Sequence, residues 1–127
     1  MSTLRLLLLL ALAGGAWAWW SGDLGRMIAR DPAPNYAEHD PRAGLAPGQV
    51  VMIGADWCGY CRRQLGDFER AGVRFRWLDF DTAEGRAAAG ALGARGVPVT
   101  VIGPDVVRGY DTAALKTHLE PLGYRIY

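Results

Sequence analysis

Two cysteines, Cys58 and Cys61, are the residues whose type and spacing suit chemistry most directly. They are the only cysteines in the chain, and they lie three positions apart in the stretch ADWCGYCRRQ. This spacing fits a redox couple, in which one thiolate attacks a disulfide and the second thiol resolves the mixed disulfide. It also fits half of a metal site or a closed structural bridge.

The surroundings of the pair favour the redox interpretation and divide the roles between the two sulfurs. Cys58 stands at the predicted start of a helix, where backbone N–H groups and the helix dipole favour a thiolate. Cys61 shares one helical face with Leu65 and Phe68, so we expect it to be the more buried thiol. We therefore predict Cys58 as the nucleophile and Cys61 as the resolving cysteine, with Arg62 and Arg63 one turn further on.

The other two interpretations have weaker support in the sequence. A zinc ion or iron–sulfur cluster needs about four ligands, and the chain has no second CxxC pair. The two histidines, His39 and His118, are far apart, so no metal site is predicted within one chain. A bridge across two residues gains little loop-closure free energy, which makes a purely structural disulfide a poor reason for this spacing. A glutathione- or cluster-binding module without turnover remains the alternative function.

The elements that must position the pair alternate between strands and helices. Apolar and β-branched runs predict strands at 49–57, 73–80, 96–103 and 105–110, the last two joined by a turn at Gly103-Pro104. Helical spacing predicts helices from about Cys61 to Gly72 and over 81–92, the latter with Asp81 and Glu84 as a capping box. The last helix starts at Asp111 or Thr112, presents Leu115, Leu119 and Leu122 on one face, and ends near Pro121.

This order predicts an α/β domain with a mixed four-stranded sheet and helices on both faces. The first two strands and the helix between them form a βαβ unit, so these strands should be parallel. The last two strands form a hairpin and must be antiparallel. We expect this domain to cover residues 49–127.

The element order, the CxxC after the first strand and Val97-Pro98 before the third together resemble the thioredoxin superfamily, over about residues 49–122. Within it the chain is most similar to the glutaredoxins. Tyr60 precedes the second cysteine, and RGYD, residues 108–111, resembles the turn with which glutaredoxins hold glutathione. The resemblance implies a cis Val97–Pro98 bond facing the cysteines, which leaves the Val97 backbone free to pair with an extended substrate.

The same resemblance implies the substrate-binding residues, which are Trp57, Tyr60, Val97, Pro98, Gly109 and Asp111. Trp57 and Tyr60 would form an apolar rim, although Trp57 could instead pack the strand end. Asp111 could equally serve as the N-cap of the last helix.

The chain also departs from the glutaredoxin pattern. Trp57 before Cys58 is a thioredoxin-like feature, and Ala55 replaces a lysine that often contacts glutathione. The buried acidic residue of thioredoxins would fall at position 52, where this chain has Met52 instead. No bound cofactor is implied, and glutathione is expected as a co-substrate.

The first twenty residues predict export. Arg5 precedes an apolar run over residues 6–20, which is shorter than the roughly 20 residues of a comfortable membrane helix. Ala16 and Ala18 fit a signal-peptidase site, whereas Trp17, Trp19 and Trp20 suit a retained anchor over residues 4–20. Residues 1–20 are therefore a signal peptide or membrane anchor, and the proline-rich residues 21–48 are a linker. Either outcome predicts a periplasmic or extracytoplasmic location.

Charge and composition restrict the partners. The chain has 14 basic and 13 acidic residues and a net charge of +1, which argues against nucleic acid. Half of its residues are apolar, enough for one cored domain in 127 residues. We expect a monomer whose partners are protein or glutathione disulfides, with a membrane electron donor if the protein works as an exported reductase.

Overall fold

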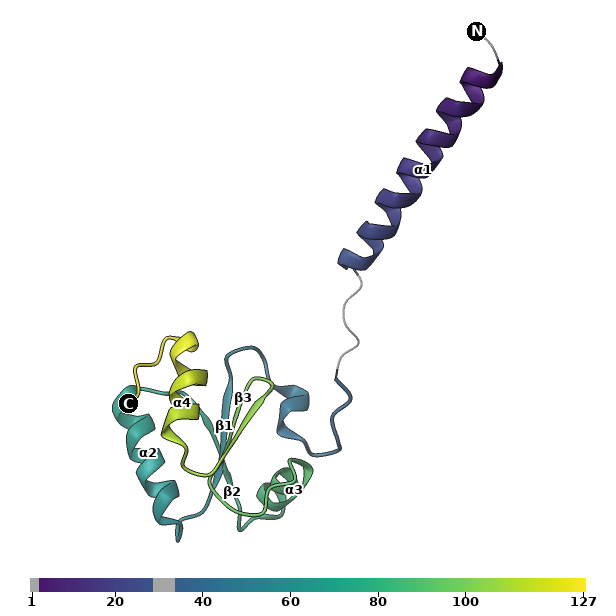
Figure 1. Cartoon of the computed structure of the whole chain (residues 1–127). Coiled ribbons are helices and arrows are strands. Elements are labelled where there is room, and N and C mark those ends of the chain that lie inside the picture. The colour runs from purple at the N-terminus through teal and green to yellow at the C-terminus, as the bar shows by residue number, and fades with distance from the viewer. Residues whose placement is uncertain (1–2, 29–33) are drawn as a thin grey trace. The chain divides into compact units, whose positions relative to one another are not determined.

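A computed structural model describes residues 3–28 and 34–127 and divides the chain after Asn35. In the first unit, helix α1 runs over Thr3–Ile28, so residues 21–28 are helical rather than part of an irregular linker (Figure 1). The second unit begins at Tyr36, which places residues 36–48 in the compact domain. Residues 1–2 of the predicted leader and 29–33 of the predicted linker lie outside the described residues. No helix in the two described ranges combines the length and apolarity that crossing a membrane requires.

The second unit contains the predicted mixed four-stranded sheet. Its elements are β1 (Val50–Gly54), α2 (Gly59–Ala71), β2 (Arg76–Asp79), α3 (Ala83–Ala91), β3 (Val99–Ile102), β4 (Asp105–Arg108) and α4 (Thr112–Leu119). The strands are ordered β2-β1-β3-β4, with β1 and β2 parallel and the other two pairings antiparallel. The predicted element order, the βαβ unit and the hairpin are therefore confirmed.

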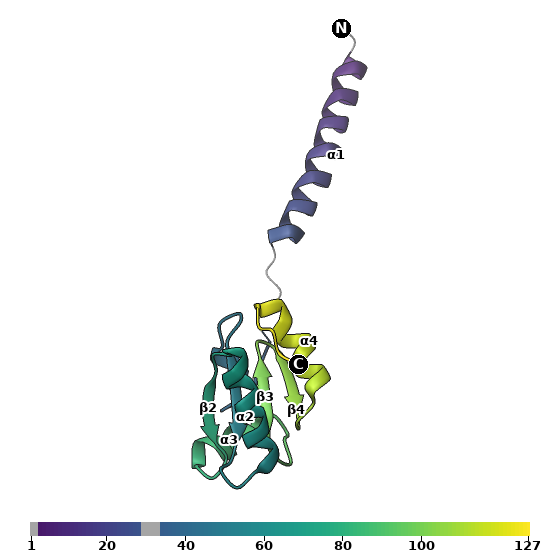
Figure 2. The same ribbon diagram turned by 90° about the vertical axis from the view of Figure 1, so that its left-hand side faces the viewer.

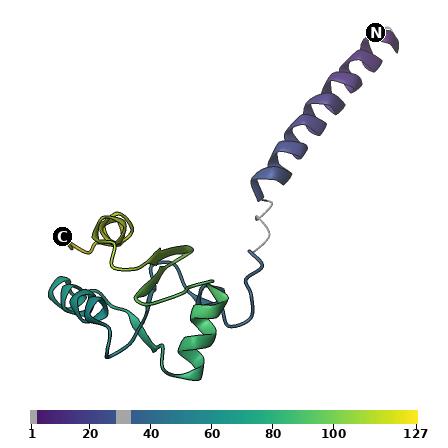
Figure 3. The same ribbon diagram turned by 60° about the horizontal axis from the view of Figure 1, so that its bottom comes forward.

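Helices cover both faces of the sheet, as predicted. Helices α2 and α4 lie on one face and α3 on the other (Figures 2 and 3). Val50 and Met52 of β1 join the core beneath α2 and α4, whereas Val51 and Ile53 join the core beneath α3. Because successive side chains of a strand point to opposite faces, the buried apolar run of β1 supplies both cores.

Caps fix the ends of the helices that flank the predicted site. Helix α2 has Cys58 as its N-cap and ends at Gly72, whose φ of +67° suits a residue without a Cβ. Asp111 caps α4 by accepting a hydrogen bond from the Ala114 N–H at 2.9 Å. Pro121 lies in a 3₁₀ turn, Glu120–Leu122, just after α4 ends. Leu122 is in that turn and exposed, so it does not continue the buried face of α4.

All four strands are shorter than predicted, and one predicted helix cap is wrong. Strand β2 is shorter than predicted, because residues 73–75 precede its pairing with β1, which begins at Arg76. The N-cap of α3 is Thr82, whose hydroxyl accepts the Gly85 N–H at 3.1 Å, so Asp81 is not the cap. Asp81 instead accepts a hydrogen bond from Trp57. The length of β2 depends on its pairing with β1, which is distant in the chain.

The segment before β1 is ordered by a local ion pair. Asp40 is buried and accepts hydrogen bonds from the Arg42 backbone N–H and guanidinium, the shortest being 2.6 Å to Nη2. The Arg42 guanidinium holds the pKa of the Asp40 carboxyl below its usual value. A groove of about 830 Å³ runs between this segment, β2 and α3. None of the predicted site residues lines that groove.

Candidate active site

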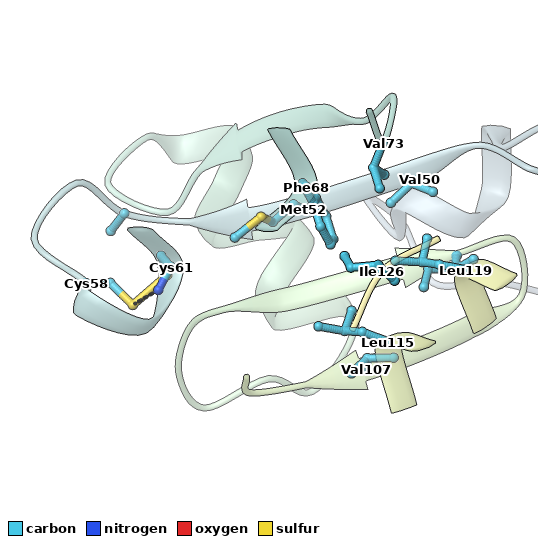
Figure 4. Close-up of a cluster of buried hydrophobic side chains, with 12 residues drawn as sticks. Val50, Met52, Cys58, Cys61, Phe68, Val73, Val107, Leu115, Leu119 and Ile126 are labelled. Atoms are coloured by element: carbon cyan, nitrogen blue, oxygen red, sulfur yellow. Dashed lines mark hydrogen bonds between the residues drawn. A yellow bond between two sulfur atoms is a disulfide. The ribbon is translucent and has the colours of Figure 1, made fainter. Parts of the chain in front are cut away.

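The two cysteines form a disulfide at the start of α2. Their Cα atoms are 5.2 Å apart, and the Cys61 N–H donates to the Cys58 Sγ at 3.2 Å (Figure 4). Cys58 keeps 7% of its surface exposed, whereas Cys61 is fully buried. The predicted helix-start position of Cys58 and the deeper burial of Cys61 are therefore confirmed. A sulfur at an N-cap receives the backbone donors that stabilise negative charge there.

The loop before β3 brings a proline beside the disulfide. The Val97–Pro98 bond is cis, as the resemblance implied. The Cys58 Sγ lies 3.8 Å from the Val97 carbonyl oxygen. Gly109 donates its N–H to the Pro98 carbonyl at 2.8 Å and has a φ of +77°, a conformation that favours glycine. Of the residues predicted for this side of the site, Val97, Pro98 and Gly109 therefore lie next to one another.

Exposed aromatic side chains flank the cysteines in the chain. Trp57 and Tyr60 are 63% and 60% exposed. The Trp57 indole N–H donates to the Asp81 carboxylate at 3.0 Å, so this ring does not pack the strand end. The Tyr60 ring stacks on the Tyr110 ring, with centroids 6.0 Å apart and an interplanar angle of 28°. Both rings are accessible to a substrate, as expected for an apolar rim.

The two arginines after Cys61 contact groups other than the sulfurs. The Arg62 guanidinium donates to the Asp56 backbone carbonyl at 2.6 Å. The Arg63 guanidinium lies 5.7 Å from the centre of the Tyr60 ring, a cation–π arrangement. Electrostatic support for Cys58 therefore rests on the start of α2 itself.

A hydrogen-bonded cluster on α2 was not predicted from sequence. The Asp67 carboxylate accepts hydrogen bonds from the hydroxyls of Tyr110 and Tyr127, at 2.7 Å in the case of Tyr127, and pairs with Arg70. The hydrogen bond to Asp67 raises the pKa of the Tyr110 hydroxyl, and burial followed by the same carboxylate raises that of Tyr127. The Asp67–Arg70 spacing was the only local signal, since both tyrosines are more than 40 positions away.

A buried polar pair beneath the disulfide was also missed. Gln64 of α2 and Thr100 of β3 are fully buried, and the Gln64 amide Nε2 donates to the Thr100 Oγ1 at 2.6 Å. The sequence held a signal that Gln64 would be buried, although not that it would contact Thr100. Gln64 lies three positions after Cys61, within the face that Cys61, Leu65 and Phe68 define.

The two histidines take no part in this site. His39 lies in the segment before β1, 3.7 Å from Glu38. His118 is half-buried on α4, 3.3 Å from Asp105, which fits the expected packing role. Among residues 3–28 and 34–127, no three His, Cys, Asp or Glu side chains form a group that could hold a metal ion.

Comparison with known proteins shows that this fold is similar to that of glutaredoxins. No protein-family model matches the chain, and no curated protein does. Solved structures do match. A glutaredoxin from Archaeoglobus fulgidus is 26% identical with a TM-score of 0.52, covering 72% of this chain and 97% of its own. A wheat glutaredoxin is 27% identical with a TM-score of 0.53, covering 67% and 86%.

A third match is a buckwheat glutaredoxin in complex with glutathione, 29% identical with a TM-score of 0.50, covering 59% of this chain and 76% of that one. The chain is a glutaredoxin-like protein of the thioredoxin superfamily. Its fold, with the Cys58–Cys61 disulfide beside a cis-proline, supports thiol–disulfide oxidoreductase chemistry.

Proposed function

We propose that this glutaredoxin-like protein is a thiol–disulfide oxidoreductase in which Cys58 is the nucleophile and Cys61 resolves the intermediate. The observation that carries the proposal is the unequal placement of the two sulfurs. Cys58 caps α2 and keeps 7% of its surface exposed, while Cys61 is fully buried. In the reduced protein the α2 N-terminus favours a Cys58 thiolate, which attacks one sulfur of a substrate disulfide and releases the other as a thiolate.

The second half of the reaction uses the short path between the two sulfurs. Cys61 loses its proton and attacks the Cys58 sulfur, which restores the protein disulfide and releases the substrate as a thiolate. The substrate is thereby reduced by two electrons and the protein is oxidised by two. The Val97 backbone beside Pro98 is the site at which an extended substrate pairs, and Trp57 and Tyr60 are its exposed apolar rim.

Glutathione is the proposed co-substrate. Support comes from the likeness to the buckwheat glutaredoxin whose structure contains glutathione. Gly109 and Asp111 are the proposed glutathione contacts, with Asp111 serving at the same time as the cap of α4. Ala55 offers no charge where the family often has a lysine, so we expect binding to rest on backbone groups and the aromatic rim. Protein disulfides are the second substrate class, and the proposed working unit is a monomer.

Export of the chain is a further part of the proposal. Its support is the sequence of residues 1–20, where Arg5 precedes an apolar run and Ala16 and Ala18 form an A-x-A site. An extracytoplasmic location, with or without anchoring through residues 4–20, would place the protein in an oxidising compartment, where thiols are converted to disulfides. A reductase there needs a membrane electron donor to return Cys58 and Cys61 to the dithiol form.

The two cysteine variants test the proposal. Cys58→Ser should reduce turnover of a glutathionylated peptide and of a protein disulfide to the background rate, because no nucleophile remains. Cys61→Ser should still form the first mixed disulfide and accumulate it, detectable by mass spectrometry. In cells, the species trapped by Cys61→Ser also report the substrate class and the compartment. If the Cys58→Ser variant traps mixed disulfides through Cys61 while the Cys61→Ser variant traps none through Cys58, the assigned roles are reversed.

A further inference from the structure

The side chain of Gln64 is buried with one half of its amide unpaired. Its Nε2 donates to the Thr100 Oγ1 at 2.6 Å. Its Oε1 has no hydrogen-bond partner. Among the described residues, it is the one buried side-chain oxygen or nitrogen atom without a partner. A buried amide oxygen without a donor costs free energy, so such a group calls for a physical explanation. In the oxidised protein no group donates a hydrogen bond to this oxygen.

The fold places Gln64 about one helical turn from the buried Cys61, on the same helix. Cys61 and Gln64 are three positions apart on α2, so their side chains are neighbours on one helix face. On the sheet, the Cys61 Sγ lies over Gly54, 3.2 Å from where a Cβ would stand. Thr100, the partner of Gln64, pairs with Met52, which is two residues before Gly54 on the same strand face. Between α2 and the sheet, the disulfide therefore lies over Gly54, and the Gln64 amide lies over the neighbouring Met52–Thr100 pair.

Reduction changes the hydrogen-bonding capacity of Cys61 and leaves that of Gln64 unchanged. In the disulfide the Cys61 sulfur carries no proton and can donate nothing to Oε1. Two thiols that reduce the disulfide become one disulfide, while Cys58 becomes a thiolate, Cys61 becomes a thiol and one proton is released. The Cys61 thiol is then a buried donor whose hydrogen bond both the Cys58 thiolate and the Gln64 Oε1 can accept, and Oε1 is the acceptor that otherwise has no donor.

We propose that Gln64 is a positioning residue for the redox reaction, whose Oε1 accepts a hydrogen bond from the Cys61 thiol in the reduced protein. This inference rests on the proposed oxidoreductase function. The contact exists only in the dithiol form, so it stabilises that form relative to the disulfide and makes the pair a stronger oxidant. Thr100 holds the amide by its nitrogen, which leaves Oε1 available as an acceptor.

The first test is the equilibrium between protein and a glutathione redox buffer. Gln64→Met keeps the side-chain length but removes the oxygen, so the equilibrium constant should shift about five- to tenfold toward the disulfide, which is about 20 to 30 mV. Gln49→Met is the matched control, because Gln49 is an exposed glutamine whose Oε1 accepts the Ala46 N–H. The control should leave the equilibrium unchanged. An unchanged equilibrium in Gln64→Met as well would overturn the inference.

The second test observes the thiol itself and does not depend on variant stability. In Cys58→Ser the Cys61 thiol is the only S–H group in the protein. Its infrared S–H stretching band should move to higher frequency when Gln64→Met is added, because the hydrogen bond is lost, and should return toward its original position with Gln64→Glu at low pH. A band that stays in place contradicts the proposal. Neither test requires turnover, so failure of the oxidoreductase function would appear separately, as an inactive wild-type protein with a normal Gln64 effect.

Discussion

The two faces of the sheet are built from the same strands, and they differ in what they bury. The face under α3 is apolar, with Val51, Ile53, Val99 and Val101 packed against the alanines of α3. The face under α2 and α4 has a similar apolar core around Phe68 and Leu115, and this core includes the disulfide (Figure 4). The same face also buries the Gln64–Thr100 pair. One face therefore serves stability alone, and the other combines stability with chemistry.

Two glycines mark this difference. Gly85 lets α3 approach β2 so closely that a Cβ there would overlap the Asp79 backbone carbonyl. Gly54 leaves room for a sulfur and an aromatic ring, because a Cβ there would overlap the Trp77 ring and lie 3.2 Å from the Cys61 Sγ. In one case the missing side chain makes room for backbone, and in the other for a reactive group. Substitutions at these positions test whether the faces are separable.

The largest effect is expected from Gly85→Ala. The Asp79 carbonyl cannot move without displacing β2, so the variant should lose about 2–3 kcal/mol of unfolding free energy, measured by urea denaturation. Its disulfide equilibrium should stay unchanged. Gly90→Ala is the control on the same helix, because nothing lies within 4 Å of its Cβ position. It should be neutral or stabilising by up to about 1 kcal/mol, since alanine favours helix. Equal losses in both variants would contradict a role for close packing.

Gly54→Ala should have a smaller effect on stability and a larger one on chemistry. The Trp77 ring is half-buried and its outer atoms can give way, so we expect a loss of about 1–2 kcal/mol. The Cys61 sulfur must also shift, which should slow the resolving step several-fold, as seen in single-turnover release of a Cys58 mixed disulfide. A resolving rate equal to that of the wild type would show that the two functions of this face are independent.

The smallest effect is expected from Asp67→Asn at the rim of the same face. The carboxylate accepts two tyrosine hydroxyls, and its loss should cost about 1 kcal/mol. Because the folded protein raises the pKa of Tyr110 and Tyr127, this contribution is fully present below the unfolded tyrosine pKa, about 10, and is lost as the pH rises above it. The variant should therefore lose less stability between pH 9 and 11 than the wild type. Tyrosinate absorbance should also appear at lower pH.

The sequence predicted the parts of the site that depend on neighbours along the chain. Cys58 at the start of α2, Cys61 on its buried face, Gly72 at its end and Asp111 as a cap all follow from spacing and residue type. It did not predict that Thr82 rather than Asp81 caps α3, nor that Trp57 is held by Asp81. The Trp57–Asp81 contact joins residues 24 positions apart, which local sequence does not reveal.

By itself, then, the sequence determined the order of helices and strands in the second unit, the parallel β1–β2 pair, the β3–β4 hairpin and the placement of the two cysteines at the start of α2, because hydrophobic period, caps and turn residues act over a few positions. Only the tertiary structure decided that Tyr60 stacks on Tyr110, that Asp67 gathers two tyrosines, and that Gln64 meets Thr100 beneath the disulfide. Those contacts join residues far apart in the chain. Their geometry is fixed by how α2 and α4 pack on the sheet, and local propensity carries no information about that packing.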